Sequence, residues 1–258
     1  MKTQLFATAT AIALSLAVAA HAAPCDTTTD EKATTPLLYS ALKGDAANVR
    51  CLLDEGAAVD APTAGTRWTP LMLAAMEGHT DVMRALLDKG AAIDAAEEDG
   101  FTALMIAAQR GRADAVRLLL EKGAKVDATD TGKHTALMLA AAKGHTGILR
   151  LLLDAGAHVN AADEGSKTAL GLAAFTGHTD AARLLLECGA NVGTADKIGT
   201  TALMAAAMQG HADTVKLLLE KGASVNAADS EGATALSLAE KDGHAEVVKL
   251  LKAAGAKK

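Results

Sequence analysis

The chain has 258 residues, half of them apolar and only 2% aromatic, and its formal net charge is −6 at neutral pH. Alanine and leucine make up most of the apolar half and favour helices over strands, so the composition predicts a helical core. An acidic chain without a basic tract lacks the electrostatic footprint of a protein that binds nucleic acid or anionic lipid. We therefore expect neither as a principal partner.

Residues 1–22 differ from the rest and predict a secretory signal peptide. Lys2 gives a positive start, residues 5–20 are apolar with small polar interruptions, and Ala20-His21-Ala22 offers a small-residue cleavage site. The polar interruptions argue against an uncleaved membrane anchor. Pro24, directly before Cys25, departs from the small residue of a lipoprotein signal. We expect cleavage after residue 22, an exported protein in the periplasm or, alternatively, outside the cell, and no membrane insertion afterwards.

From residue 32 onward the sequence repeats itself, after a polar arm at residues 23–31. Seven copies lie at about residues 32–65, 66–98, 99–131, 132–164, 165–197, 198–230 and 231–258. A threonine opens each copy: Thr35, Thr69, Thr102, Thr135, Thr168, Thr201 and Thr234. Their spacing is 33 residues, except for one step of 34. A fixed period of this length predicts a stack of similar units.

Each copy carries the signals of two short helices. The opening threonine suits an N-cap, since its hydroxyl can accept a backbone N–H, and Pro36 and Pro70 follow at a position that tolerates proline. One glycine ends the first apolar run and another ends the second, leucine-rich run, as Gly144 and Gly156 do. A polar stretch with Asp and Gly then suits a tight hairpin. The predicted unit is helix, turn, helix and hairpin-like loop.

The period, the Thr-Pro-Leu or Thr-Ala-Leu opening, the "AA..GH" centre and the "LLL..GA.VNA" close resemble the ankyrin repeat. The resemblance covers residue 32 to the C-terminus and implies an all-α repeat solenoid of seven ankyrin repeats, elongated and curved. Such stacks need polar end units, and Glu240 in the last copy replaces an alanine of the inner copies.

One position departs from the ankyrin pattern. Where the family usually carries His after Thr-Pro-Leu, this chain has Leu38, Met72, Met105, Met138, Gly171, Met204 and Ser237. The threonine–histidine hydrogen bond of that motif is therefore absent. We expect thioether packing to replace it.

Histidines and acids give no sign of a metal site or of catalysis. Five histidines follow the first glycine of their copies: His79, His145, His178, His211 and His244. They stand one repeat apart, too far to share an ion, because packed helices lie about 8–10 Å from one another. We expect them to tie one repeat to the next, while His158 stands apart. We interpret Glu97, Glu98 and Asp99 as a solvated acidic turn, and we expect no catalysis, metal or cofactor.

Three cysteines occur in a chain that we expect in an oxidising compartment. Cys25 lies in the polar arm and Cys51 on the second helix of the first copy, so a disulfide would strap the arm over the end of the stack. Two unpaired thiols are the alternative. Cys188 is too many repeats away to pair with either, and we expect it free or paired with another molecule.

The residues that vary between copies are the candidates for function. In ankyrin proteins the binding surface typically comes from the hairpin tips and the exposed end of the first helix. The candidates at those places are Trp68, Met76, Glu77, Phe101, Gln109, Arg110, His134, Lys143, Phe175 and Met208. Aromatic side chains and methionine are frequent interface anchors. We predict a concave aromatic and thioether patch on repeats two and three; alternatively, Trp68 and Phe101 only cover the hairpin backbone.

The sequence therefore favours a monomeric, exported interaction scaffold, similar to the ankyrin-repeat proteins that bacteria send to the periplasm. It would bind a protein partner and protect, regulate or neutralise an envelope enzyme or a toxin. A secreted effector that binds a host protein is an alternative. An enzyme or ligand-binding protein with an unrecognised site in the groove is the rival class.

Overall fold

The computed structural model describes residues 24–29 and 35–257. The described residues form fourteen short helices in consecutive pairs, one pair for each copy of the repeat. The first helices are α1 (Pro36–Lys43), α3 (Pro70–Glu77), α5 (Ala103–Gln109), α7 (Ala136–Ala142), α9 (Ala169–Phe175), α11 (Ala202–Met208) and α13 (Ala235–Lys241). The second helices are α2 (Ala46–Asp54), α4 (Thr80–Asp88), α6 (Ala113–Glu121), α8 (Thr146–Asp154), α10 (Thr179–Glu187), α12 (Ala212–Glu220) and α14 (Ala245–Ala253).

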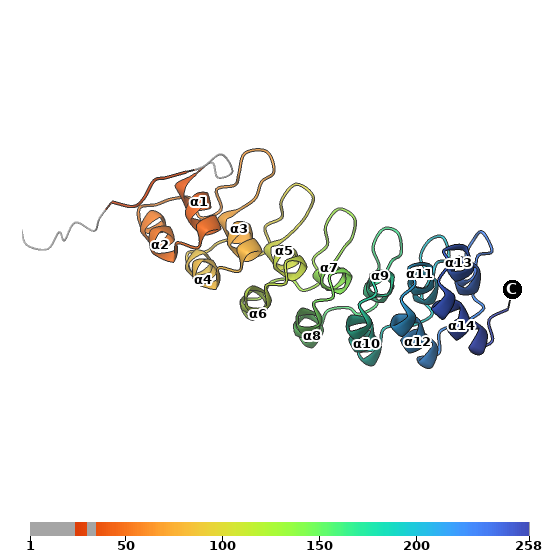
Figure 1. Ribbon diagram of the computed structural model, residues 1–258. Helices are drawn as coiled ribbons and strands as arrows, with labels where there is room; N and C mark the ends of the chain where they lie inside the picture. Colours follow the sequence, from red (N-terminus) through yellow and green to blue (C-terminus); the bar gives the residue numbers. More distant parts are fainter. Residues whose placement is uncertain (1–23, 30–34, 258) are drawn as a thin grey trace, which may run out of the picture.

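The pairs stack side by side into an elongated array of two helical layers (Figure 1). Each first helix packs on the first helix of the next repeat, and each second helix on the next second helix. Leu137 of α7 and Leu149 of α8 are among the fully buried side chains of the continuous core between the layers. The expected all-α repeat solenoid is thus confirmed. The predicted signal peptide, residues 1–22, lies outside the described residues.

Threonine and glycine delimit the helices as expected. At all seven first helices the threonine hydroxyl accepts the backbone N–H three residues later, at 3.2–3.4 Å. Gly144, which follows α7, has a φ of +70°, and a Cβ there would lie only 2.6 Å from Nδ1 of His178. This turn therefore requires glycine for both conformation and space.

Methionine takes part of the role that histidine has in the family pattern. The four methionines at that position are almost fully buried: Met72, Met105, Met138 and Met204. In addition, the sulfur of Met72 accepts a hydrogen bond from the backbone N–H of Thr69 at 3.5 Å, and the sulfur of Met204 accepts the equivalent bond from Thr201. The expected thioether packing is confirmed in these four repeats.

The hairpin loops are built on a recurring carboxylate, which corrects one interpretation of the sequence. Glu97 is not solvated but buried, and its Oε1 accepts the backbone N–H groups of Asp99 and Phe101 at 2.9 and 3.0 Å. Asp130, Asp163, Asp196 and Asp229 accept equivalent bonds in later repeats. The physical reason is that each tight loop leaves N–H groups that need an acceptor. These acids shape loops.

A disulfide joins Cys25 to Cys51 across a Cα–Cα distance of 5.7 Å. Next to it, the side chain of Asn48 accepts the backbone N–H of Asp26 and donates to its carbonyl, both at 2.8 Å. The Asp26 carboxylate accepts hydrogen bonds from the backbone N–H and from the hydroxyl of Thr28. Both bonds lower the pKa of Asp26, and the backbone bond has the larger effect. This turn is therefore complete at neutral pH and weakens only as the pH falls through that lowered pKa. We call residues 24–29 with this disulfide the N-terminal strap.

One tie between repeats is missing at Gly193. In other copies the side chain of an Asp or Asn at this position accepts a backbone N–H of the next repeat, as Asp94 does from Lys125 at 2.9 Å and Asn160 from Asn191 at 2.8 Å. Glycine has no side chain for the equivalent bond to Ser224.

We expect Gly193→Asn to stabilise the stack by about 1 kcal/mol, because it restores one hydrogen-bond acceptor between repeats. Urea unfolding followed by circular dichroism measures the change. Gly193→Ala is the matched control, since it adds a side chain without an acceptor. Equal stabilisation by both substitutions would contradict the hydrogen-bond explanation.

Candidate binding surface

The predicted site residues lie where the first helices end and where the hairpin loops project, a surface that we call the inner face. Trp68 and Met76 are partly buried and pack against Leu38 and Leu73 in a small apolar cluster. Phe101 is also partly buried and packs against the main core. The rings of Trp68 and Phe101 therefore have a packing role within their own repeats. That they also form a binding patch on repeats two and three stays a prediction.

Histidines fix the helix ends of the inner face. Nε2 of His145 lies 3.3 Å from the carbonyl oxygen of Gln109, and Nε2 of His211 lies 3.0 Å from that of Phe175. Equivalent contacts join His79 to Leu42 and His244 to Met208. The expected ties between repeats are confirmed in these four cases.

Sequence reasoning missed that Arg112 replaces histidine in this series. Its Nε donates to the carbonyl of Met76 at 3.0 Å, and its Nη2 lies 3.6 Å from Oε2 of Glu77. The long guanidinium thus makes the tie between repeats and also pairs with Glu77, one of the predicted binding residues. The signal was available, because Arg112 follows Gly111 as histidine follows the same glycine elsewhere.

The two described histidines outside the repeated series, His134 and His158, each face an aspartate. Nδ1 of His134 lies 2.9 Å from Oδ2 of Asp130, and its Nε2 lies 3.6 Å from Oδ2 of Asp163. His158 hydrogen-bonds Asp127 of the preceding repeat. His134 thereby bridges the hairpins of repeats four and five, and only part of its ring faces solvent. Arg110 and Lys143, at the ends of α5 and α7, are exposed and contribute positive charge to the inner face.

An open groove of about 310 Å³ lies on the inner face between repeats five and six. Two of the predicted residues, Phe175 and Met208, line it. Phe175 is 44% exposed and Ile198, also in the lining, is 60% exposed; these are the exposed large apolar side chains of the described chain. Ile198 was missed, although the other copies place polar residues or glycine there. The most accessible apolar surface is therefore in repeats five and six.

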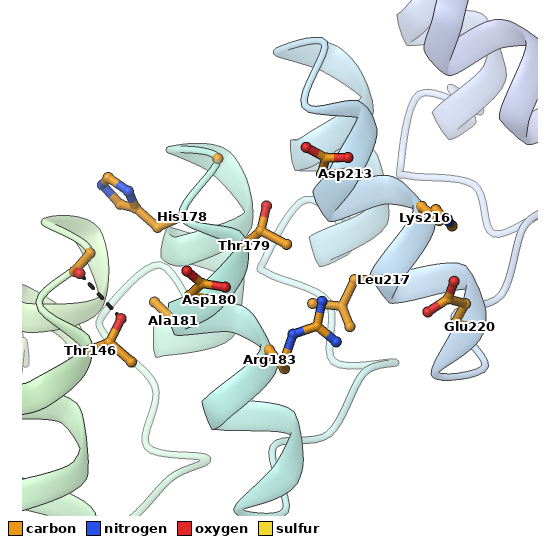
Figure 2. Close-up of a pocket in the computed structure, with 12 residues that line it drawn as sticks. Thr146, His178, Thr179, Asp180, Ala181, Arg183, Asp213, Lys216, Leu217 and Glu220 are labelled. Carbon is orange, nitrogen blue, oxygen red and sulfur yellow. Dashed lines mark hydrogen bonds between the residues drawn. The ribbon is translucent and has the colours of Figure 1, made fainter.

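The second helices form the layer that we call the outer layer, and it carries a larger, polar hollow of about 650 Å³ over α10 and α12 (Figure 2). Its charged side chains are of both signs: Asp180, Arg183, Asp213, Lys216 and Glu220. All five are exposed to solvent. Ala181, which also lines the hollow, occupies the place where α4 has the larger Val82. Because these charged side chains are solvated, the hollow contains no buried acid, base or nucleophile.

Within the described residues, one group of three potential metal ligands lies close together: Cys25, Cys51 and Glu55. Both sulfur atoms of this group are joined in the disulfide, so they are not thiolate ligands. Cys188 is exposed at the end of α10. No helix of the described chain has the length and apolar character to cross a membrane.

Models of the family described as ankyrin repeats match residues 9–95, 59–130, 127–196 and 170–258. These matches extend over most of the chain, so the protein belongs to the ankyrin-repeat family. Among curated proteins, no match was found. Ankyrin repeats generally mediate protein–protein interaction and typically form non-catalytic scaffolds. The chain is therefore assigned to the class of ankyrin-repeat proteins.

Proposed function

We propose that this protein is an exported ankyrin-repeat scaffold that binds a partner protein through its inner face and has no catalytic activity of its own. The observation that carries the proposal is the exposure of Phe175 and Ile198 on that face. Large apolar side chains gathered in one open patch usually mark an interaction surface.

The rigidity of the inner face supports the same function. Histidine and arginine side chains hold the helix ends, and a backbone ladder joins successive hairpins, with Thr131 N–H on the Asp99 carbonyl at 2.9 Å and Ser230 N–H on the Ile198 carbonyl at 2.8 Å. A surface that is already ordered loses little conformational entropy when it binds. The inner face is thus preorganised over several repeats.

Export is proposed from two features at the N-terminus. Residues 1–22 have the charge, apolar run and cleavage site of a signal peptide. The Cys25–Cys51 disulfide suits the oxidising periplasm or the extracellular space. A partner in that compartment, such as an envelope enzyme or a toxin that must be neutralised, fits a scaffold of this kind. N-terminal sequencing of the exported protein tests the cleavage after residue 22.

We expect the double substitution Trp68→Ala, Phe101→Ala to weaken partner binding by roughly tenfold or more, because aromatic anchors dominate interfaces. Affinity capture from the native envelope, with the wild type and the variant compared quantitatively, measures the loss. Arg183→Ala with Lys216→Ala on the outer layer is the control. Undiminished capture by the folded aromatic variant would remove repeats two and three from the interface.

A further inference from the structure

The groove between repeats five and six results from two small residues. Gly171 occupies the position at which four other repeats have a buried methionine, and a Cβ there would meet only Oγ1 of Thr168, at 3.8 Å. Ala205 occupies the position at which every other repeat has Tyr, Leu or Ile. Both residues line the groove. Glycine within a helix and a missing methionine both lower the stability of the folded chain. The packing of the repeats therefore does not explain why this gap exists.

The edges of the groove carry large apolar side chains, and at the Ile198 position the other copies have polar residues or glycine. Phe175 ends α9 and stands beside the gap, and Ile198 projects from the hairpin that precedes α11. Leu172 and Met208 extend the apolar surface between them. Four features thus coincide in one place: two missing side chains and two exposed apolar ones. A bulky apolar side chain of another molecule would fill the gap and cover both edges.

The charged groups of the lining are Lys167 and Asp196. Oδ1 of Asp196 accepts the backbone N–H groups of Ile198 and Thr200, at 3.0 and 2.8 Å, so this carboxylate is engaged in the hairpin. Lys167 is exposed, and within the described chain its ammonium group forms no hydrogen bond or ion pair. The groove therefore offers an apolar floor with one available cation at its edge.

We propose that this groove binds an extended segment of the partner protein that inserts a leucine or phenylalanine over Gly171 and places an acidic side chain against Lys167. The inference rests on the proposed function and names the chemistry of the partner. A volume of about 310 Å³ lies at the small end of ligand sites, which suits one or two side chains. Because hairpin residues such as Ser166 and Ile198 line the groove, the rest of the segment can continue over the hairpins of the inner face.

A phage-displayed library of random short peptides, selected on the full chain, tests the proposal. We expect the selected peptides to share a Leu or Phe with Asp or Glu one or two positions away. A synthetic peptide from the best clone is then titrated by fluorescence anisotropy against three variants. Gly171→Met, which fills the gap, and Lys167→Glu, which reverses the charge, are each expected to weaken binding by roughly tenfold or more.

Lys133→Glu, in the hairpin of repeat four and outside the groove lining, is the matched control and should change binding little. Gly171→Met installs the residue of four sister repeats, so it should fold and raise the unfolding temperature. Peptides that bind both groove variants as tightly as the wild type would overturn the groove and leave the proposed function standing. Peptides without an acid, or with undiminished affinity for Lys167→Glu, would overturn the charge assignment. The proposed function itself fails if partner capture is insensitive to substitutions anywhere on the inner face.

Discussion

Loss of the Cys25–Cys51 disulfide, by Cys51→Ser or by reduction, should destabilise the first repeat by about 3 kcal/mol. This is the size expected when a cross-link closes a loop of this length in the unfolded chain, and the two cysteines are separated by 26 positions. The first repeat also has a neighbour on one side only, so it has less packing to lose before it opens. The strap is joined to this end repeat through Cys51 and Asn48 of α2.

Hydrogen exchange followed by mass spectrometry measures this effect repeat by repeat. We expect faster exchange in α1 and α2 after reduction and little change in α13 and α14, since stacked repeats contact only their neighbours. Cys188→Ser is the control, because this exposed cysteine lies outside the strap. Uniform acceleration along the whole array would show that the strap stabilises the stack globally and contradict a local cap.

The parts that sequence reasoning predicted well are those that recur in every copy. Thr135 as an N-cap, Gly144 as a left-handed helix end and His145 as a tie follow from local chemistry, and repetition along the chain multiplies the signal. Arg112 and Glu97 show the limit of that reasoning. Their roles depend on neighbours in space: Arg112 reaches the Met76 carbonyl of the preceding repeat, and Glu97 turns its carboxylate inward to the N–H groups of its own loop.

The groove could not be predicted for a related reason. Gly171 was visible in the sequence as a departure from methionine, and Phe175 and Met208 as variable residues. Whether they form one surface depends on how α9 and α11 stack and on where the hairpin places Ile198. Trp68 and Phe101 led to the prediction of a patch on repeats two and three, but these side chains are partly buried against the core. Exposure, which decides accessibility, is a property of the stack.

Met138→Gly is expected to cost about 4 kcal/mol of the free energy of unfolding. The substitution transfers the gap of repeat five to repeat four, where Met138 is fully buried. Removal of a buried methionine side chain costs about 2–5 kcal/mol, and glycine within a helix costs about 1 kcal/mol more than alanine. Urea unfolding monitored by circular dichroism measures the loss. Met138→Leu, which conserves the apolar volume, should cost less than about 1.5 kcal/mol.

Gly171→Met is the reciprocal experiment and should gain about 1–3 kcal/mol, less than the reverse substitution costs, because the structure around Gly171 is already adapted to the gap. If both results hold, the native chain carries a destabilising residue at the one place where its inner face is most apolar. Residues that reduce stability are retained where function needs them. Unchanged stability in Gly171→Met would mean that neighbouring side chains already fill the gap, and the groove would then lose its physical basis as a binding site.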